Sequence, residues 1–103
     1  MRVVWLPATV ADLQRLREFI LPHNREAAQR AVKFIKAAVA MIETSPRIGK
    51  PAEDLPDYQD LPIPFGAAGY LLRYRIYQDA IYIVAIRHGK EAGYSGERDQ
   101  GVR

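Results

Sequence analysis

The strongest structural signal in this chain lies between residues 69 and 88, which read GYLLRYRIYQDAIYIVAIRH. Two runs rich in β-branched and aromatic residues flank the dipeptide Gln78–Asp79, and the first run alternates with a period of two. A two-residue turn at this dipeptide predicts a β-hairpin in which Tyr77 lies opposite Ala80. The same register places Arg75 opposite Tyr82.

The two faces of this predicted hairpin differ in polarity. The first face carries no charge before Arg87, and its members are Tyr70, Leu72, Tyr74, Ile76, Ile81, Ile83 and Ala85. The second face combines basic, aromatic and aliphatic side chains, namely Arg73, Arg75, Tyr82, Val84, Ile86 and His88. We expect helices to cover the first face and a partner to bind the second.

The first half of the chain predicts one short strand and two helices. Residues Arg2–Leu6 form the strand, and Pro7 ends it. Thr9 is the predicted N-cap of the first helix, and Asn24 is that of the second, which ends before Ser45–Pro46. The second helix has an apolar stripe at helical spacing, made of Ala28, Ala31, Val32, Ile35, Ala38, Val39 and Ile42.

Two prolines determine where the segment Tyr58–Phe65 is expected in the sheet. Pro62 and Pro64 lack N–H donors, and residues two apart on a strand point their backbone groups toward the same neighbour. One side of this segment therefore cannot form a regular ladder, which predicts an edge strand. The strand Arg2–Leu6 is then expected beside the last strand, at the other edge.

These elements predict an α+β fold of two layers, with the chain order β-α-α-β-β-β. The predicted sheet is antiparallel in the order 2-3-4-1, with the helix hairpin packed on one face. Because the two helices form a hairpin, the first strand is expected to run antiparallel to the last. We assign residues 1–94 to one domain and residues 95–103 to a polar C-terminal tail that frays.

Several kinds of chemistry have no support in the sequence. The chain has no cysteine and only two histidines, and it lacks phosphate-binding, dinucleotide-binding and His-Glu-x-x-His motifs, so we expect no metal site and no cofactor. No apolar run reaches a membrane-spanning length and no secretory signal is recognisable, so a cytoplasmic location is expected. We interpret the acidic residues Glu53, Asp54, Asp57 and Asp60 as a solvated loop.

Basic and aromatic residues gather in two places. One is the loop that contains Arg47 and Lys50, and the other is the open sheet face with its exit, which carries Arg73, Arg75, Arg87, His88, Lys90 and Tyr94. Arginines among aromatic rings bind either the phosphates of a nucleic acid or the carboxylates of an acidic peptide. A net charge of +3 suits both partners, and a face with solubilising arginines is the third interpretation.

Three motifs give the chain a family resemblance over roughly residues 1–94. They are Pro-Arg-Ile-Gly-Lys-Pro at 46–51, Tyr-Leu-Leu-Arg-Tyr-Arg-Ile at 70–76 and Ile-Arg-His-Gly-Lys-Glu at 86–91. In these motifs the chain resembles the RelE/ParE superfamily, the toxins of bacterial type II toxin–antitoxin (plasmid-stabilisation) systems. The resemblance implies a cognate, ParD-like antitoxin whose C-terminal segment wraps the toxin, and contact with operator DNA only through that antitoxin.

The superfamily divides by target, and this chain departs from its nucleases. The nucleases resembled here carry Lys-x-Lys on the second strand and an arginine after Gly-Tyr on the third, where this chain has Pro62-Ile63-Pro64 and Leu71. Proline and leucine neither neutralise a phosphate nor transfer a proton. The departure favours a ParE-like toxin that inhibits DNA gyrase through contacts, without catalysis. The alternatives are a ribosome-dependent mRNA endoribonuclease and a remnant that binds its antitoxin without toxicity.

Each hypothesis assigns a set of residues. The expected target-binding residues are Arg47, Lys50, Arg87, His88, Lys90 and Tyr94. The expected antitoxin-binding residues are Arg73, Arg75, Tyr82 and Ile86. If the chain is a nuclease, the catalytic candidates are Arg73, Arg87, His88, Lys90 and Tyr94.

Overall fold

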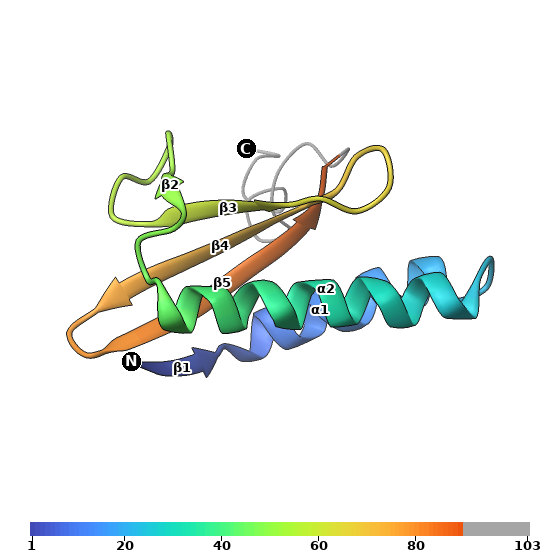
Figure 1. The fold of residues 1–103 in the computed structure, drawn as a ribbon, viewed down its shortest axis with the longest axis horizontal. Helices are drawn as coiled ribbons and strands as arrows, with labels where there is room; N and C mark the ends of the chain where they lie inside the picture. The colour runs from blue at the N-terminus through green and yellow to red at the C-terminus, as the bar shows by residue number, and fades with distance from the viewer. Residues whose placement is uncertain (90–103) are drawn as a thin grey trace, which may run out of the picture.

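The computed structural model describes residues 1–89, so the predicted tail and the site candidates Lys90 and Tyr94 lie outside the described residues. A helix hairpin covers one face of a five-stranded sheet, as the α+β prediction requires (Figure 1). The elements in chain order are β1 (Arg2–Trp5), α1 (Pro7–Ile20), α2 (Arg25–Thr44), β2 (Lys50–Pro51), β3 (Gln59–Ile63), β4 (Tyr70–Tyr77) and β5 (Ala80–His88).

The sheet has the order β1-β5-β4-β3-β2, which confirms the predicted arrangement of the four longer strands. The predicted direction of β1 is wrong, because β1 pairs parallel to β5, with Arg2 opposite Ala80. The helix hairpin returns the chain to the end of the sheet at which β1 starts (Figure 1). The strands β3, β4 and β5 then alternate in direction, so β3 and β5 run the same way, which is also the direction of β1.

The predicted edge position of β3 is also wrong, since β2 pairs antiparallel with its outer side. The two residues of β2 lie opposite Gln59 and Asp60, both of which retain their N–H groups. Pro62 and Pro64 follow this stretch and have no partner in β2. The prolines therefore limit the outer ladder to one short segment but do not prevent it.

A β-bulge in β5 changes which side chains face the helices. The hairpin register is as predicted from the pair Tyr77–Ala80 to the pair Tyr74–Ile83, but Arg73 then lies opposite Ala85. The extra residue reverses the alternation beyond it. Ile86 therefore lies opposite Leu72 and is fully buried, so its predicted place on the open face is wrong.

The same bulge exchanges the last two residues of the strand. His88 lies opposite Tyr70, and their ring centroids are 5.6 Å apart, so the predicted place of His88 on the open face is also wrong. Arg87 lies opposite Leu71 and shares the open face with it. Without the bulge, Ala85 would lie opposite Leu72 in place of Ile86, and Arg87 would lie opposite Tyr70 in place of His88. The bulge therefore buries a larger apolar side chain and keeps a charged group off the helix side of the sheet.

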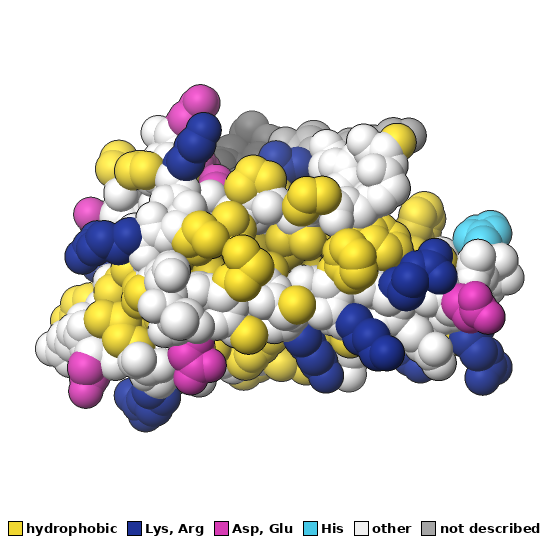
Figure 2. All heavy atoms as spheres, in the orientation of Figure 1, with side chains coloured by type: hydrophobic (Ala, Val, Ile, Leu, Met, Phe, Trp, Pro, Cys, Tyr) yellow, Lys and Arg dark blue, Asp and Glu magenta, His cyan; other side chains and the backbone are white. Residues whose placement is uncertain are grey.

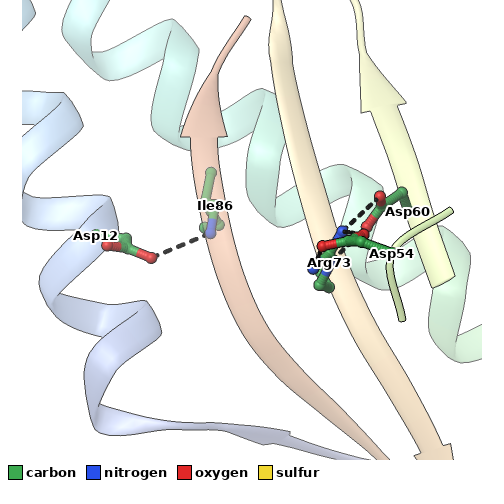
Figure 3. A network of polar contacts seen from close by, with 5 residues as sticks. All are labelled: Asp12, Asp54, Asp60, Arg73 and Ile86. Carbon is green, nitrogen blue, oxygen red and sulfur yellow. Dashed lines mark hydrogen bonds and ion pairs between the residues drawn. The ribbon is translucent and has the colours of Figure 1, made fainter. Parts of the chain in front are cut away.

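The backbone of Leu6 and two side chains of α1 continue the hydrogen bonding of β5 beyond the end of β1. Leu6 N donates to Ile83 O over 3.3 Å, and the buried Thr9 hydroxyl donates to the same oxygen over 2.6 Å. Farther along, Ile86 N donates to the Asp12 carboxylate over 3.2 Å (Figure 3). Residues 9 and 12 lie on one face of the helix, so α1 replaces β1 as the neighbour of β5 there.

The two helix starts differ in how well the sequence predicts them. Pro7 is the first residue of α1 and Leu6 is its N-cap, so the prediction of Thr9 as N-cap is wrong. The hydroxyl of Thr9 is used by the sheet instead. Asn24 caps α2 as predicted, and its side chain accepts a hydrogen bond from Ala27 N over 3.0 Å.

The core lies between the helix hairpin and the sheet. The stripe on α2 is confirmed, because six of its seven residues are buried, with Val32 half-buried. Three buried isoleucines of β5 and two aromatic or aliphatic residues of β4 complete the centre of the core, namely Ile81, Ile83, Ile86, Leu72 and Tyr74.

Candidate functional site

The loop between α2 and β3 is fixed to the sheet by one tyrosine. The Tyr74 ring is fully buried, and its hydroxyl lies 2.7 Å from Pro46 O and 2.8 Å from Gln59 Oε1. The same hydroxyl accepts a hydrogen bond from Gly49 N over 2.9 Å. Burial raises the pKa of this phenol, so it stays neutral and remains a donor as well as an acceptor.

Gly49 is required by this close approach. A Cβ atom at residue 49 would lie 2.8 Å from the Tyr74 hydroxyl oxygen and 3.1 Å from Asp60 O. This explains in physical terms why glycine stands inside the Pro-Arg-Ile-Gly-Lys-Pro motif. The motif holds the two basic residues Arg47 and Lys50 on the surface, where both are exposed.

A partly buried ion-pair cluster holds the next part of the loop (Figure 3). Arg73 is only 5% exposed, and its Nε and Nη2 atoms lie 2.9 and 3.1 Å from the Asp60 carboxylate. Its Nη1 and Nη2 atoms lie 3.2 and 2.7 Å from the two oxygens of Asp54. The interpretation as a solvated loop is therefore wrong for Asp60, which lies in β3 with its side chain 19% exposed. Asp54 lies on the loop and is 55% exposed, although it too is paired with Arg73. Because two carboxylates surround Arg73, its charge is balanced within the protein.

Arg75 lies in a different environment on the same face. Its Cζ atom is 5.4 Å from the centroid of the Tyr58 ring and 5.2 Å from that of Tyr77. Tyr82 lies opposite Arg75 on β5, as predicted. These residues line a shallow cleft of about 230 Å³ whose remaining walls are Leu6 and Val84.

The other end of the open face is mostly apolar. Pro62 lies opposite Leu71, which in turn lies opposite Arg87, so the three strands place two apolar residues and one arginine in a row. His88 is not in this row, because it lies against the Tyr70 ring. The structure thus separates residues that the nuclease hypothesis groups together, with Arg73 in its ion-pair cluster and His88 at the helix side.

The predicted antitoxin-binding residues fall into two groups. Arg75 and Tyr82 lie side by side on the open face and are half-buried. Arg73 is enclosed by two carboxylates, and Ile86 is fully buried in the core. Only the first two residues therefore offer surface to a partner.

An apolar groove between α2 and β3 was not predicted. Figure 2 shows hydrophobic side chains gathered along this side of the molecule. The groove has a volume of about 310 Å³, and Phe34 and Met41 on its helix side are 47% and 51% exposed. Its sheet side includes Pro62 and Pro64. The exposed apolar positions of α2 were a possible signal, because they lie outside the stripe that packs on the sheet.

Neither a metal site nor a membrane-spanning helix is present in the part of the chain that the structure describes. Within residues 1–89, no group of three or more histidine, aspartate or glutamate side chains is arranged to hold a metal ion. No helix in the same part of the chain has both the length and the apolar character needed to cross a membrane.

Comparison with protein families identifies the chain. The family model described as "ParE toxin of type II toxin-antitoxin system, parDE" matches residues 3–93. The chain belongs to the ParE toxin family. This result confirms the RelE/ParE resemblance, and it makes the chain a toxin of a type II toxin–antitoxin system.

The chain is also similar in sequence to two RelE toxins and in fold to a chain of a ParDE system. Toxin RelE3 of Caulobacter vibrioides is 34% identical over 82% of this chain and 90% of its own length. Toxin RelE1 of the same organism is 29% identical over 78% of this chain and 84% of its own length. A solved chain from the chromosomal ParDE system of P. aeruginosa has the same fold, with a TM-score of 0.75, 22% identity, and coverage of 87% of this chain and 97% of that one.

Proposed function

We propose that this ParE-family toxin inhibits DNA gyrase through contacts and that a cognate, ParD-like antitoxin neutralises it. The observation that carries the gyrase proposal is the row formed by Pro62, Leu71 and Arg87 across the open face. The nucleases that the sequence resembles place basic residues at the first two of these positions. A row with two apolar members supports binding better than phosphate chemistry.

The surroundings of the other nuclease candidates support the same proposal. Cleavage of RNA requires one group that activates the 2′-hydroxyl and others that stabilise the charge on the phosphate. The Arg73 charge is balanced by Asp54 and Asp60, and the His88 ring lies against Tyr70. Neither residue is placed to act together with Arg87 on a substrate. Inhibition by contact needs exposed side chains only, and Arg47 and Lys50 offer these on the anchored loop.

The second candidate function is ribosome-dependent cleavage of mRNA. It is favoured by the names of the two Caulobacter relatives, both of which are RelE toxins. On this alternative the catalytic groups are drawn from Arg73, Arg87, His88, Lys90 and Tyr94, in an arrangement different from that of the nucleases resembled.

The proposed partner follows from the type of system. A ParD-like antitoxin binds the toxin with its C-terminal segment, and the complex contacts operator DNA through the antitoxin alone. The exposed apolar surface of α2 supports a macromolecular partner, because contiguous apolar patches on small proteins usually mark such interfaces.

A paired assay tests the target. Purified toxin is added to gyrase in a supercoiling reaction and, separately, to ribosomes that translate a defined mRNA. We expect loss of supercoiling, its restoration by the antitoxin, and intact mRNA. Cleavage of the mRNA together with normal supercoiling would establish the RelE-like alternative. A chain that has no effect in either assay, but that binds the antitoxin in a separate measurement, would be an antitoxin-binding remnant.

A further inference from the structure

We propose that the cleft around Arg75 is a receptor for a peptide segment that presents a carboxylate next to an apolar side chain. The tyrosine cleft, as we call it, is lined by Leu6, Tyr58, Arg75, Tyr77, Tyr82 and Val84. The proposal rests on the antitoxin partnership above and adds the chemistry of one contact within it.

The first observation is the state of the Arg75 charge. No carboxylate among the described residues forms an ion pair with Arg75, whereas both ring contacts of its guanidinium are with tyrosines. Aromatic rings attract a cation but leave its formal charge in place. They also exclude water from its surroundings, and a carboxylate that reaches a less hydrated guanidinium is bound more strongly.

The second observation is that the position of Arg75 is fixed before any partner binds. Tyr77 is on the same strand and Tyr82 lies opposite on β5, so both belong to the rigid hairpin. Tyr58 lies on the loop, where its carbonyl oxygen accepts from Ala52 N over 2.9 Å. The loop is in turn held by Arg73 through Asp54 and Asp60, which flank this tyrosine in sequence. A preorganised receptor loses little side-chain entropy on binding.

The third observation concerns the size and lining of the tyrosine cleft. A volume of about 230 Å³ is smaller than the roughly 300–1,000 Å³ of sites that enclose a whole small molecule. Leu6 and Val84 give one wall that is purely apolar. The space therefore suits a single apolar side chain of a larger partner, with the neighbouring carboxylate on Arg75.

Local charge favours a peptide over a nucleic acid. There is no net charge on the group formed by Arg73, Arg75, Asp54 and Asp60. Two further aspartates are exposed nearby, Asp57 on the loop before β3 and Asp79 in the hairpin turn. A nucleic acid brings a phosphate with every nucleotide, so it gains from rows of cations and is repelled by these aspartates. One carboxylate, in contrast, needs one arginine.

The binding experiment uses the full-length toxin and a synthetic peptide that spans the C-terminal half of the antitoxin encoded beside it. Isothermal titration is performed with the original toxin, with Arg75→Gln and with the control Arg17→Gln, which changes an exposed arginine of α1. We expect Arg75→Gln to raise Kd by roughly 10- to 100-fold, as for a partly desolvated charge pair, and the control to leave it within about 2-fold. Thermal unfolding of each variant verifies that the fold is retained.

A charge exchange makes the test specific. Arg75→Glu should weaken binding further, and replacing the contacting acidic residue of the peptide by arginine should restore part of the affinity. An unchanged Kd for Arg75→Gln would overturn the proposal while leaving the antitoxin partnership intact. Failure of the original toxin to bind the peptide or the whole antitoxin would instead overturn that partnership. Tight binding of single-stranded RNA that depends on Arg75 would show that the cleft serves a nucleic acid.

Discussion

Two neighbouring stretches of the open sheet face hold the same side chain in opposite states. Arg73 is 5% exposed, and two carboxylates balance its charge. Arg75, two residues along the same strand and on the same face, lies between two tyrosine rings without a carboxylate from the described residues. The first arginine closes a loop over the sheet, and the second is the one that we propose binds a partner.

The difference arises from the path of one loop. Asp60 lies opposite Arg73 in the sheet, and Asp54 reaches the same guanidinium from the loop that precedes β3. At the level of Arg75 the same loop contributes Tyr58. A basic residue on an alternating strand can therefore be structural or functional, and the residue that the adjacent loop places over it decides which. In this chain Arg73 holds the loop that carries Tyr58, and Tyr58 contacts Arg75.

The largest effect is expected from Arg73→Ala. This change removes the Arg73 guanidinium from Asp60, whose side chain is 19% exposed, and releases the loop. Breaking such a pair costs about 3 kcal/mol, with a reduction because Asp54 is 55% exposed. Urea unfolding should show a loss of about 2–3 kcal/mol for Arg73→Ala. The matched change Arg75→Ala should cost less than about 1 kcal/mol.

Equal losses for the two alanine variants would contradict the comparison, because they would mean that both arginines have the same structural role. A loss of stability in Arg75→Ala alone would mean that Arg75, and not Arg73, has the structural role. The affinity for the antitoxin distinguishes the variants in a second way, because Arg75→Ala should weaken binding although its fold is retained.

Most of the sheet face that packs on the helices could be predicted from the sequence, except beyond the bulge, where Ile86 takes the place predicted for Ala85. Burial follows the period of each element, so the stripe of α2 and the alternation of β4 both show directly in the residue pattern. The turn at Gln78–Asp79 and the cap at Asn24 are local signals, and both are confirmed. These features depend on neighbours within a few residues, which is the range over which a sequence pattern is informative.

The end of β5 could not be predicted on either face, because its register depends on a bulge. Nothing in the run Ile81–His88 marks the extra residue, since the run is apolar on both faces until Arg87. The bulge is favoured by a contact distant in sequence, in which Asp12 of α1 accepts the hydrogen bond of Ile86 N. The same applies to Arg73, because its two partners lie 13 and 19 residues away along the chain. The position of the bulge and the partners of Arg73 therefore depend on tertiary contacts, which a local sequence pattern does not contain.

The second largest effect is expected from Tyr74→Phe. The hydroxyl lies within hydrogen-bond distance of three loop or strand groups, Pro46 O, Gly49 N and Gln59 Oε1. Its loss leaves partly buried backbone groups without a partner, which costs about 1–2 kcal/mol. Urea unfolding should show this decrease, and Tyr77→Phe, at a ring that is 50% exposed, should change stability by less than about 0.5 kcal/mol.

Hydrogen exchange distinguishes the two residues that hold the loop, Tyr74 and Arg73. In Tyr74→Phe the amide of Gly49 should exchange faster, whereas the amide of Tyr58, which donates to Leu55 O, should keep its protection. If both amides lose protection together, the tyrosine and the Arg73 cluster hold the loop as one unit.

The smallest effect is the pH dependence contributed by Asp54. Hydrogen bonds from the Arg73 guanidinium lower the pKa of this carboxyl below its ordinary value of 3.8. The folded state therefore binds the proton less readily than the unfolded state, so the contribution to stability is complete above about pH 4. It is lost as the pH falls through the lowered pKa. The Asp54 side chain is 55% exposed, which limits this contribution to well under about 1 kcal/mol.

The variant Asp54→Asn isolates that contribution, because asparagine has no carboxyl group that becomes protonated on acidification. Between about pH 5 and pH 2, the free energy of unfolding should fall less steeply in Asp54→Asn than in the original chain. Asp57→Asn is the control, since this exposed carboxylate on the same loop forms no ion pair within residues 1–89, and its curve should keep the original slope. If Asp54→Asn also keeps that slope, the Arg73 guanidinium is held by Asp60 alone. Asp54 would then be an exposed loop residue like Asp57, and the difference between Arg73 and Arg75 would depend on the single partner within the sheet.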